Sequence, residues 1–121
     1  RDKPVWRILP LAKRKLNHAM IETVIRKRIE ILADSPLVRR VTEAIDKAGI
    51  TGWSVLPVTS GSGRDGPWRE ERVMGTDKSL VLSIASAEKA QVLVEALAPM
   101  LSSHGLLLTI WDVEVVRGER F

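Results

Sequence analysis

The segment from Ala48 to Gly66 constrains the fold more strongly than any other part of the chain. Gly49 is a typical helix terminator, because a glycine readily adopts the left-handed backbone conformation that ends a helix. The apolar run Trp53 to Thr59 then predicts a strand, which Pro57 restricts to a sheet edge or a strand end. A glycine-rich loop, Gly-Ser-Gly-Arg-Asp-Gly, follows at once. The segment therefore predicts a helix, a strand and an open loop in direct succession.

The loop contains a candidate anion site. Gly61 and Gly63 flank Ser62, and glycines let successive backbone N–H groups converge into a nest that binds phosphate or another small anion. Arg64 adds a planar guanidinium at the same place. This combination favours a sensor of a nucleotide or small anion over a catalyst.

Two similar halves surround this loop. In the first half, Ile29, Ile31 and Ala33 alternate with Arg28 and Glu30 and predict a strand from Lys27. Ser35 is the expected N-cap of the following helix, with Pro36 at its first position. The apolar stripe expected on that helix consists of Leu37, Val41, Ala44, Ile45 and Ala48.

The second half repeats this order. Ser79 to Ala85 predicts a strand, and Ser86 is the expected cap of a second helix. Gly105 closes the helical region, and Leu106 to Val116 predicts the last strand. The expected buried face of the second helix comprises Ala90, Leu93 or Val94, Leu97 and Leu101.

The resulting fold class is α+β, a ferredoxin-like βαββαβ sandwich with both helices on one face of the sheet. The long polar loop between the second and third strands spans about residues 59–77. The other face of the sheet needs a cover, and self-association is the simplest one. The side chains that we expect on that face are Leu32, Leu56, Val81, and Trp111 or Val113.

Charge is distributed unevenly along the chain. Residues 1–28 contain nine Lys and Arg against two acidic residues, whereas the rest of the chain is mildly acidic, with ten basic and thirteen acidic residues. We therefore divide the chain into a basic N-terminal extension, residues 1–26, and a folded domain, residues 27–121. The extension is a solvated tail, a docking tail for an acidic partner, or an arm that binds nucleic acid.

Several function classes are disfavoured. The chain has no cysteine and only two distant histidines, which removes most nucleophilic triads and most zinc sites. It has no Walker lysine motif and no apolar run long enough to span a membrane. We expect a cytoplasmic protein that is not an enzyme and needs no metal or cofactor.

Residues 48–55 followed by Gly61-Ser62-Gly63 resemble the first helix end, the second strand and the loop base of the PII signal-transduction proteins. The resemblance covers about residues 27–120. The run from Gly61 to Trp68 is most similar to the carboxysome-associated PII-like proteins. The family implies a homotrimer that binds an adenine nucleotide in each of three clefts between subunits. The long loop is then the T-loop, whose conformation controls a protein partner.

The resemblance also implies site residues. Gly61, Ser62, Gly63 and Arg64 would hold phosphate or bicarbonate at the T-loop base. His104, Gly105 and Leu106 would form the B-loop, although helix capping is a strong alternative role for His104. Arg117 and Arg120 would come from the neighbouring subunit.

The departures from the family are informative. The chain has no tyrosine, so tyrosyl modification of the T-loop is impossible. The B-loop is reduced to Ser102-Ser103-His104-Gly105 without its lysine, which favours ADP or AMP over ATP. Relatives of this type imply bicarbonate as a second ligand, and a bicarbonate transporter or carboxysome component as the partner, with carboxysome association.

A nucleic-acid-binding module on the same architecture is the alternative function, with the basic arm as its contact. The first and third strands carry no aromatic residue, which disfavours it. Trp53 and Trp111 are expected in the core or an interface, and Trp68 is expected as an exposed anchor in the loop.

Overall fold

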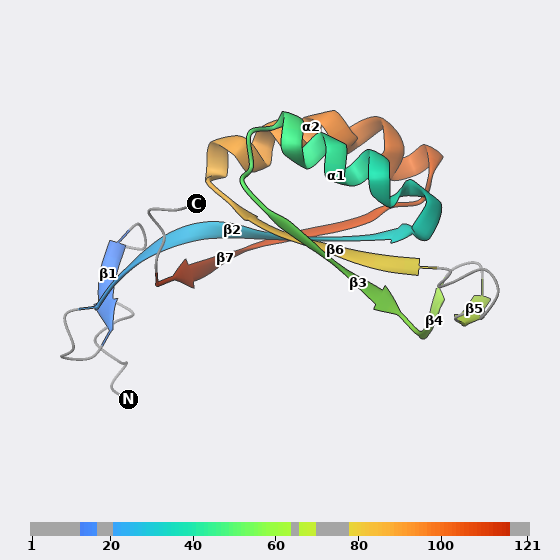
Figure 1. Cartoon of the computed structure of the whole chain (residues 1–121), viewed down its shortest axis with the longest axis horizontal. Helices are drawn as coiled ribbons and strands as arrows, with labels where there is room; N and C mark the ends of the chain where they lie inside the picture. Colours follow the sequence, from blue (N-terminus) through green and yellow to red (C-terminus); the bar gives the residue numbers. More distant parts are fainter. Residues whose placement is uncertain (1–12, 17–20, 64–65, 70–77, 117–121) are drawn as a thin grey trace.

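A sheet with two helices on one of its faces forms the body of the protein (Figure 1). The computed structural model describes residues 13–16, 21–63, 66–69 and 78–116. The elements follow one another in the order β1 (Lys13–Leu16), β2 (Ile21–Asp34), η2 (Ser35–Leu37), α1 (Val38–Lys47), β3 (Trp53–Val58), β4 (Ser60–Gly63), β5 (Gly66–Arg69), β6 (Lys78–Ala85), α2 (Ala87–Ser103) and β7 (Leu107–Val115).

The main sheet runs in the order β7–β2–β6–β3, and all of its pairs are antiparallel. The two strand–helix–strand halves interleave, with β2 and β6 in the centre. This is the ferredoxin-like order that the sequence predicts, and β3, which contains Pro57, lies at an edge as expected.

Local signals place the helix ends. Gly49 has a φ of +81° just after α1, and Gly105 has a φ of +65° after α2. Ser86 Oγ accepts a hydrogen bond from the Lys89 N–H at 3.2 Å, so it caps α2 as predicted. Ser35 does not cap α1; it begins the short 3-10 helix η2, and its hydroxyl lies 2.9 Å from that of Ser79.

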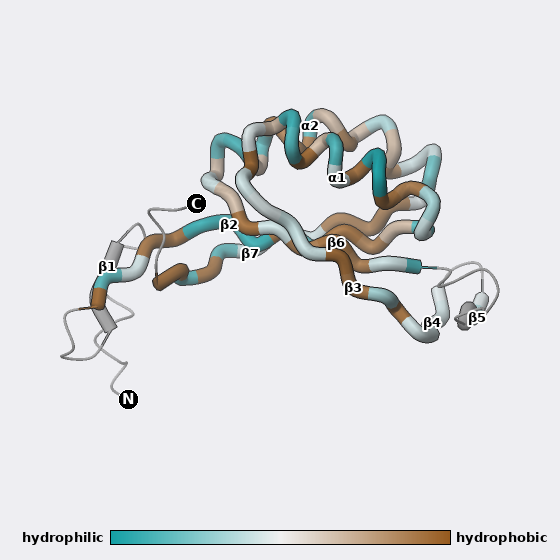
Figure 2. Tube along the Cα trace, in the orientation of Figure 1, coloured by the Kyte–Doolittle hydropathy of each residue, from teal (hydrophilic) through white to brown (hydrophobic). Residues whose placement is uncertain are grey.

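The core lies between the sheet and the helices. Apolar colour runs along the strands, and hydrophilic colour marks much of the outer helix surface (Figure 2). Most of the buried residues come from the central strands β2 and β6 and from the inner faces of α1 and α2. The core consists of Ile29, Ile31, Ala33, Val41, Ile45, Ile50, Val81, Ala85, Ala90, Leu93, Leu97, Met100 and Leu106.

The face assignment of β6 corrects one prediction. Val81, expected on the open face, pairs with Ile31 and is fully buried beneath the helices. Its neighbours Leu80, Leu82 and Ile84 face the other way and are half-buried. The prediction failed because β6 is apolar at successive positions, so its alternation does not reveal which side faces the helices.

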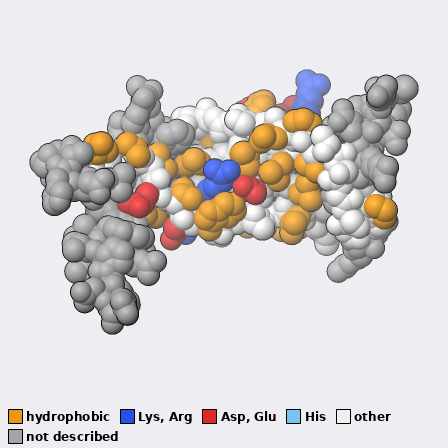
Figure 3. All heavy atoms as spheres, turned by 90° about the horizontal axis from the view of Figure 1, so that it is seen from below, with side chains coloured by type: hydrophobic (Ala, Val, Ile, Leu, Met, Phe, Trp, Pro, Cys, Tyr) orange, Lys and Arg blue, Asp and Glu red, His pale blue; other side chains and the backbone are white. Residues whose placement is uncertain are grey.

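The open face carries apolar side chains, as the sequence predicts. Leu56 is 43% exposed and Leu107 is 58% exposed, and both lie level with Leu32 in the register. Viewed from the side opposite the helices, this face is dominated by apolar side chains around a small charged group (Figure 3). The salt bridge between Arg28 and Glu30, at 3.3 Å, belongs to this face.

The first strand is longer than expected. The alternation predicts a strand from Lys27, but β2 begins at Ile21 and pairs through residues 21–24 with β1. Thr23 is buried there and donates a hydrogen bond to Glu114 at 2.8 Å. Part of the segment assigned to the basic extension therefore joins the sheet, whereas the division into extension and domain stays a prediction.

Replacement of Leu93 by alanine tests the core. Leu93 is fully buried, so Leu93→Ala should lower the free energy of unfolding by about 2–5 kcal/mol, measured by chemical denaturation. The neighbouring Val92 is 50% exposed, and Val92→Ala is the matched control, with an expected loss under about 0.5 kcal/mol. Equal losses in the two variants would contradict the packing described here.

Candidate functional site

The predicted anion cradle lies in a small hairpin. Gly61, Ser62 and Gly63 belong to β4, which pairs with β5 in a two-stranded sheet separate from the main one. Gly61 is opposite Trp68, and Gly63 is opposite Gly66, whose φ is +100°. In a strand, successive N–H groups point to opposite sides. The convergent nest that the sequence suggests is therefore not formed in this conformation.

The predicted arginines lie outside the described residues. This holds for Arg64, between β4 and β5, and for Arg117 and Arg120, beyond β7. Their roles stay predictions, and only the elements that lead to them can be placed.

The predicted B-loop is well defined. His104 is the C-cap of α2 and donates its backbone N–H to the Met100 carbonyl at 3.1 Å, which agrees with the capping role. Leu106 is buried in the core, so only its backbone remains available to a ligand. Through the buried side chain of Leu106, the segment packs the start of β7 against the helices.

One end of the sheet brings the two candidate segments together. Val58, at the end of β3, pairs with Lys78, which pairs in turn with Asp34 at the end of β2. Leu107, at the start of β7, pairs with Leu32 near that same end. The β4–β5 hairpin and the α2–β7 connection consequently lie at the same end of the molecule (Figure 1).

Sequence analysis missed a polar cluster beside His104. Its Nε2 lies 3.4 Å from Nη1 of Arg40 on α1, and its Nδ1 lies 2.8 Å from the Ser103 hydroxyl. Ser103 itself donates to the Pro99 carbonyl at 2.7 Å. Ser103 therefore accepts from Nδ1–H, and Nε2 accepts from the guanidinium. The sequence does not distinguish Arg40 from the adjacent Arg39, because the contact between Arg40 and His104 depends on how α1 packs against α2.

The tryptophans partly match expectation. Trp53 lies 44% exposed on β3, and its indole N–H donates to Asp46 on α1 at 3.1 Å. Trp111 lies on the open face, with the Arg28 guanidinium 5.7 Å from its ring centroid. Neither side chain is in the core, since Trp111 is also 41% exposed, and an interface role for both stays a prediction. Trp68 is placed in β5 by its backbone alone.

The alternative nucleic-acid module requires aromatic residues on the central strands. Neither β2 nor β6 contains one, and Trp111 belongs to the edge strand β7. This arrangement does not provide the stacking surface that such domains use.

A shallow groove of about 340 Å³ separates the two helices. Its polar walls come from α1, and its apolar floor comes from both helices.

Within the described ranges, no group of three His, Cys, Asp or Glu side chains could hold a metal ion. None of the helices in that part of the chain combines the length and apolar character needed to cross a bilayer.

Comparison with known structures finds the same fold in bacterial proteins. CPII from Thiomonas intermedia K12, bound to ADP and bicarbonate, is 24% identical, with a TM-score of 0.75 over 84% of this chain and 98% of that one. A second CPII structure, bound to ADP, AMP and bicarbonate, is 25% identical, with a TM-score of 0.72 over 84% and 97%.

A putative PII-like signaling protein from Thermus thermophilus is 26% identical, with a TM-score of 0.67 over 82% of this chain and 97% of that one. No curated protein matches the chain. The family model described as nitrogen regulatory protein P-II matches residues 26–120, nearly the whole described fold. The chain therefore belongs to the P-II family of regulatory proteins and has the PII-like variant of the ferredoxin-like fold.

Proposed function

We propose that this protein is a PII-like sensor that binds ADP or AMP, together with bicarbonate, in clefts between the subunits of a homotrimer. The main support is the likeness to CPII, whose structures contain ADP, AMP and bicarbonate. The convergence of the T-loop base and the predicted B-loop at one end of the sheet adds a physical reason, because it concentrates backbone polar groups there.

The width of this end suits a nucleotide. Three inter-strand spacings separate β7 from β3, which gives about 14 Å. Lys78 lies between them on β6, ion-paired with Asp34 at 2.6 Å. The segment Gly61–Arg64 on one side and His104–Leu106 on the other would then face the two ends of a bound ligand.

The course of β7 favours a site shared between subunits. β7 starts beside Leu32 and ends with Val115 opposite Val24, at the far end of the sheet. Its nine residues span about 26 Å, whereas the five residues after it that include Arg120 reach at most about 17 Å. Arg120 therefore cannot reach the T-loop base of its own chain. A cleft that contains both takes Arg117 and Arg120 from a neighbouring subunit.

The same inference links ligand binding to the T-loop. The anion nest requires Gly61–Gly63 to leave the strand conformation of β4. An isolated two-stranded hairpin is marginally stable, so binding energy can shift its population. The ligand-bound loop would then present a different surface to a protein partner, which we propose is a bicarbonate transporter or carboxysome component.

Calorimetric titration tests the ligands. ADP and AMP should bind more tightly than ATP, because the predicted B-loop has no lysine for a third phosphate. Bicarbonate should raise the affinity for ADP, and ADP should raise that for bicarbonate by the same factor. Absence of heat with all four ligands would reject the sensor function and leave only the fold.

Substitution of Arg64 tests the anion cradle. Arg64→Ala should weaken bicarbonate or nucleotide binding about tenfold, as expected for the loss of one charge-assisted contact, and leave the oligomer intact. Lys89→Ala, which removes one positive charge from the start of α2, is the control. An unchanged affinity in the Arg64 variant would place the anion elsewhere.

The oligomer is tested on the open face. Leu56→Glu introduces a charge at a position that is exposed in the single chain, so it should release monomers of 13.5 kDa without unfolding them. Val92, on the helical side, is 50% exposed, and Val92→Glu should leave the trimer intact. Sedimentation equilibrium distinguishes the two, and a trimer in both variants would show that another surface holds the subunits together.

A further inference from the structure

The predicted B-loop has a deficit of positive charge. Ser102 to Leu106 contains no lysine or arginine, and α2 has no basic residue in its last turn. A nucleotide phosphate held here needs a cation from another element, because backbone N–H groups compensate only part of its charge. His104 alone is a weak candidate, since its two ring nitrogens are already engaged.

Arg40 provides that cation from α1. Its Nη1 lies 3.4 Å from Nε2 of His104, although the two residues are 64 positions apart in the sequence. His104 is in turn held by Ser103, whose hydroxyl is fixed on the Pro99 carbonyl. This contact places the exposed guanidinium beside the end of α2.

The guanidinium of Arg40 also has unused capacity. Its side chain is exposed, and within the described part of the chain it pairs with no carboxylate. Two other cations have carboxylate partners: Arg39 lies 3.5 Å from Glu43, and Lys78 lies 2.6 Å from Asp34. Four N–H donors of Arg40 remain for a second partner, in a planar fork that matches phosphate oxygens.

We propose that Arg40 is a phosphate-binding residue, positioned by His104, which supplies from α1 the charge that the B-loop lacks. This inference rests on the proposed nucleotide function and adds to it a residue that neither the loop nor the C-terminal strand provides. It also assigns His104 a positioning role, through its ring, besides the cap made by its backbone.

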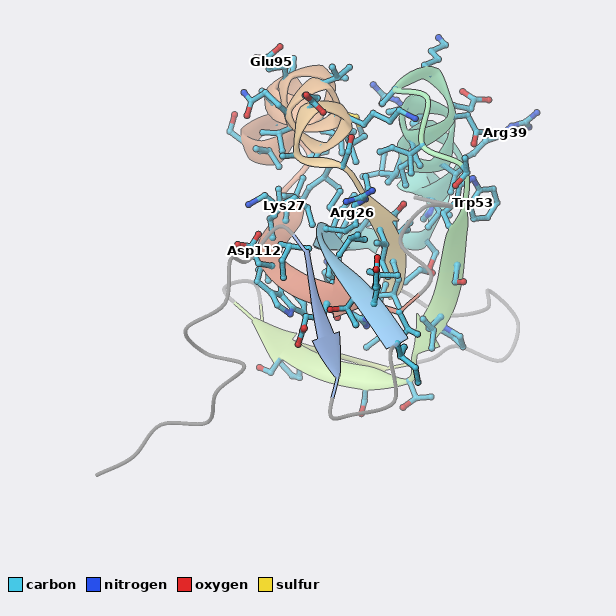
Figure 4. The ribbon with its side chains drawn as sticks, turned by 90° about the vertical axis from the view of Figure 1, so that its left-hand side faces the viewer. Arg26, Lys27, Arg39, Trp53, Glu95 and Asp112 are labelled. Atoms are coloured by element: carbon cyan, nitrogen blue, oxygen red, sulfur yellow. The ribbon has the colours of Figure 1, made fainter. Side chains whose placement is uncertain are left out.

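Arg39 offers a matched control. It is adjacent in sequence and carries the same charge, but its side chain is 89% exposed and points outward from α1 in the end-on view (Figure 4). Its contact with Glu43 is an exposed i,i+4 pair, which contributes little to stability. Changes that follow from net charge or helix propensity therefore affect both variants equally.

The experiment is a calorimetric titration of the full chain with ADP. Arg40→Gln should weaken ADP about tenfold relative to Arg39→Gln, as the loss of one charge-assisted contact predicts. Arg40→Lys should recover part of the affinity, because the ammonium keeps the charge but not the fork. His104→Ala should weaken ADP less than Arg40→Gln, since the cation remains but is no longer oriented.

Three results would overturn the inference. Equal ADP affinities in Arg40→Gln and Arg39→Gln, with both variants folded by circular dichroism, would leave Arg40 as a helix-terminal charge only. An equal loss of ADP affinity in Arg40→Lys and Arg40→Gln would show that the positive charge of Arg40 does not contribute to binding. Absence of ADP binding by the unsubstituted protein would reject the proposed function as well, so the two failures are distinguishable.

Discussion

The register between β2 and β6 is the constraint on which the rest of the molecule depends. Ile31 lies opposite Val81 and faces the helices, whereas Leu32 lies opposite Leu80 and faces away from them. A slip of one residue would exchange these faces and expose the core. On the face away from the helices, β6 carries Leu80, Leu82 and Ile84, and β2 carries Leu32 beside the charged Arg28 and Glu30. The apolar positions on that face lack cover in the described part of the single chain, an incompleteness that the proposed trimer would remove.

That incompleteness connects packing to ligand binding. The antiparallel course of β7 carries the chain from the end beside the T-loop base to the opposite end, where Val115 lies beside Val24. Residues that follow β7 can contribute to a T-loop cleft only when another copy brings its own far end close. In the proposed trimer, covering the open face and completing the site would be one event, so changes that loosen the subunits are expected to reduce the proposed nucleotide binding.

Local signals made much of this fold predictable. Gly49, the Ser86 cap and the alternation of Ile29 and Ile31 each act within a few residues, and the structure confirms them. The sheet face of Val81 was mispredicted because a strand that is apolar at successive positions has no alternation to identify its buried side. The Arg40–His104 contact was missed because it depends on how α1 packs against α2. The local sequence could not predict the conformation of Gly61–Gly63 either, since glycine permits both a strand and an anion-binding nest.

This last ambiguity bears directly on how a sensor of this kind would work. In the β4–β5 hairpin, only alternate N–H groups of β4 face β5, whereas a nest would turn successive N–H groups towards one anion. The two arrangements need different backbone conformations of the same residues, so they exclude each other. Each 1.4 kcal/mol of differential binding shifts their ratio about tenfold. A hairpin of four-residue strands offers few other interactions to oppose that shift. The proposed anion binding would therefore be coupled to the T-loop conformation through the backbone itself, without a need for a longer pathway through the core.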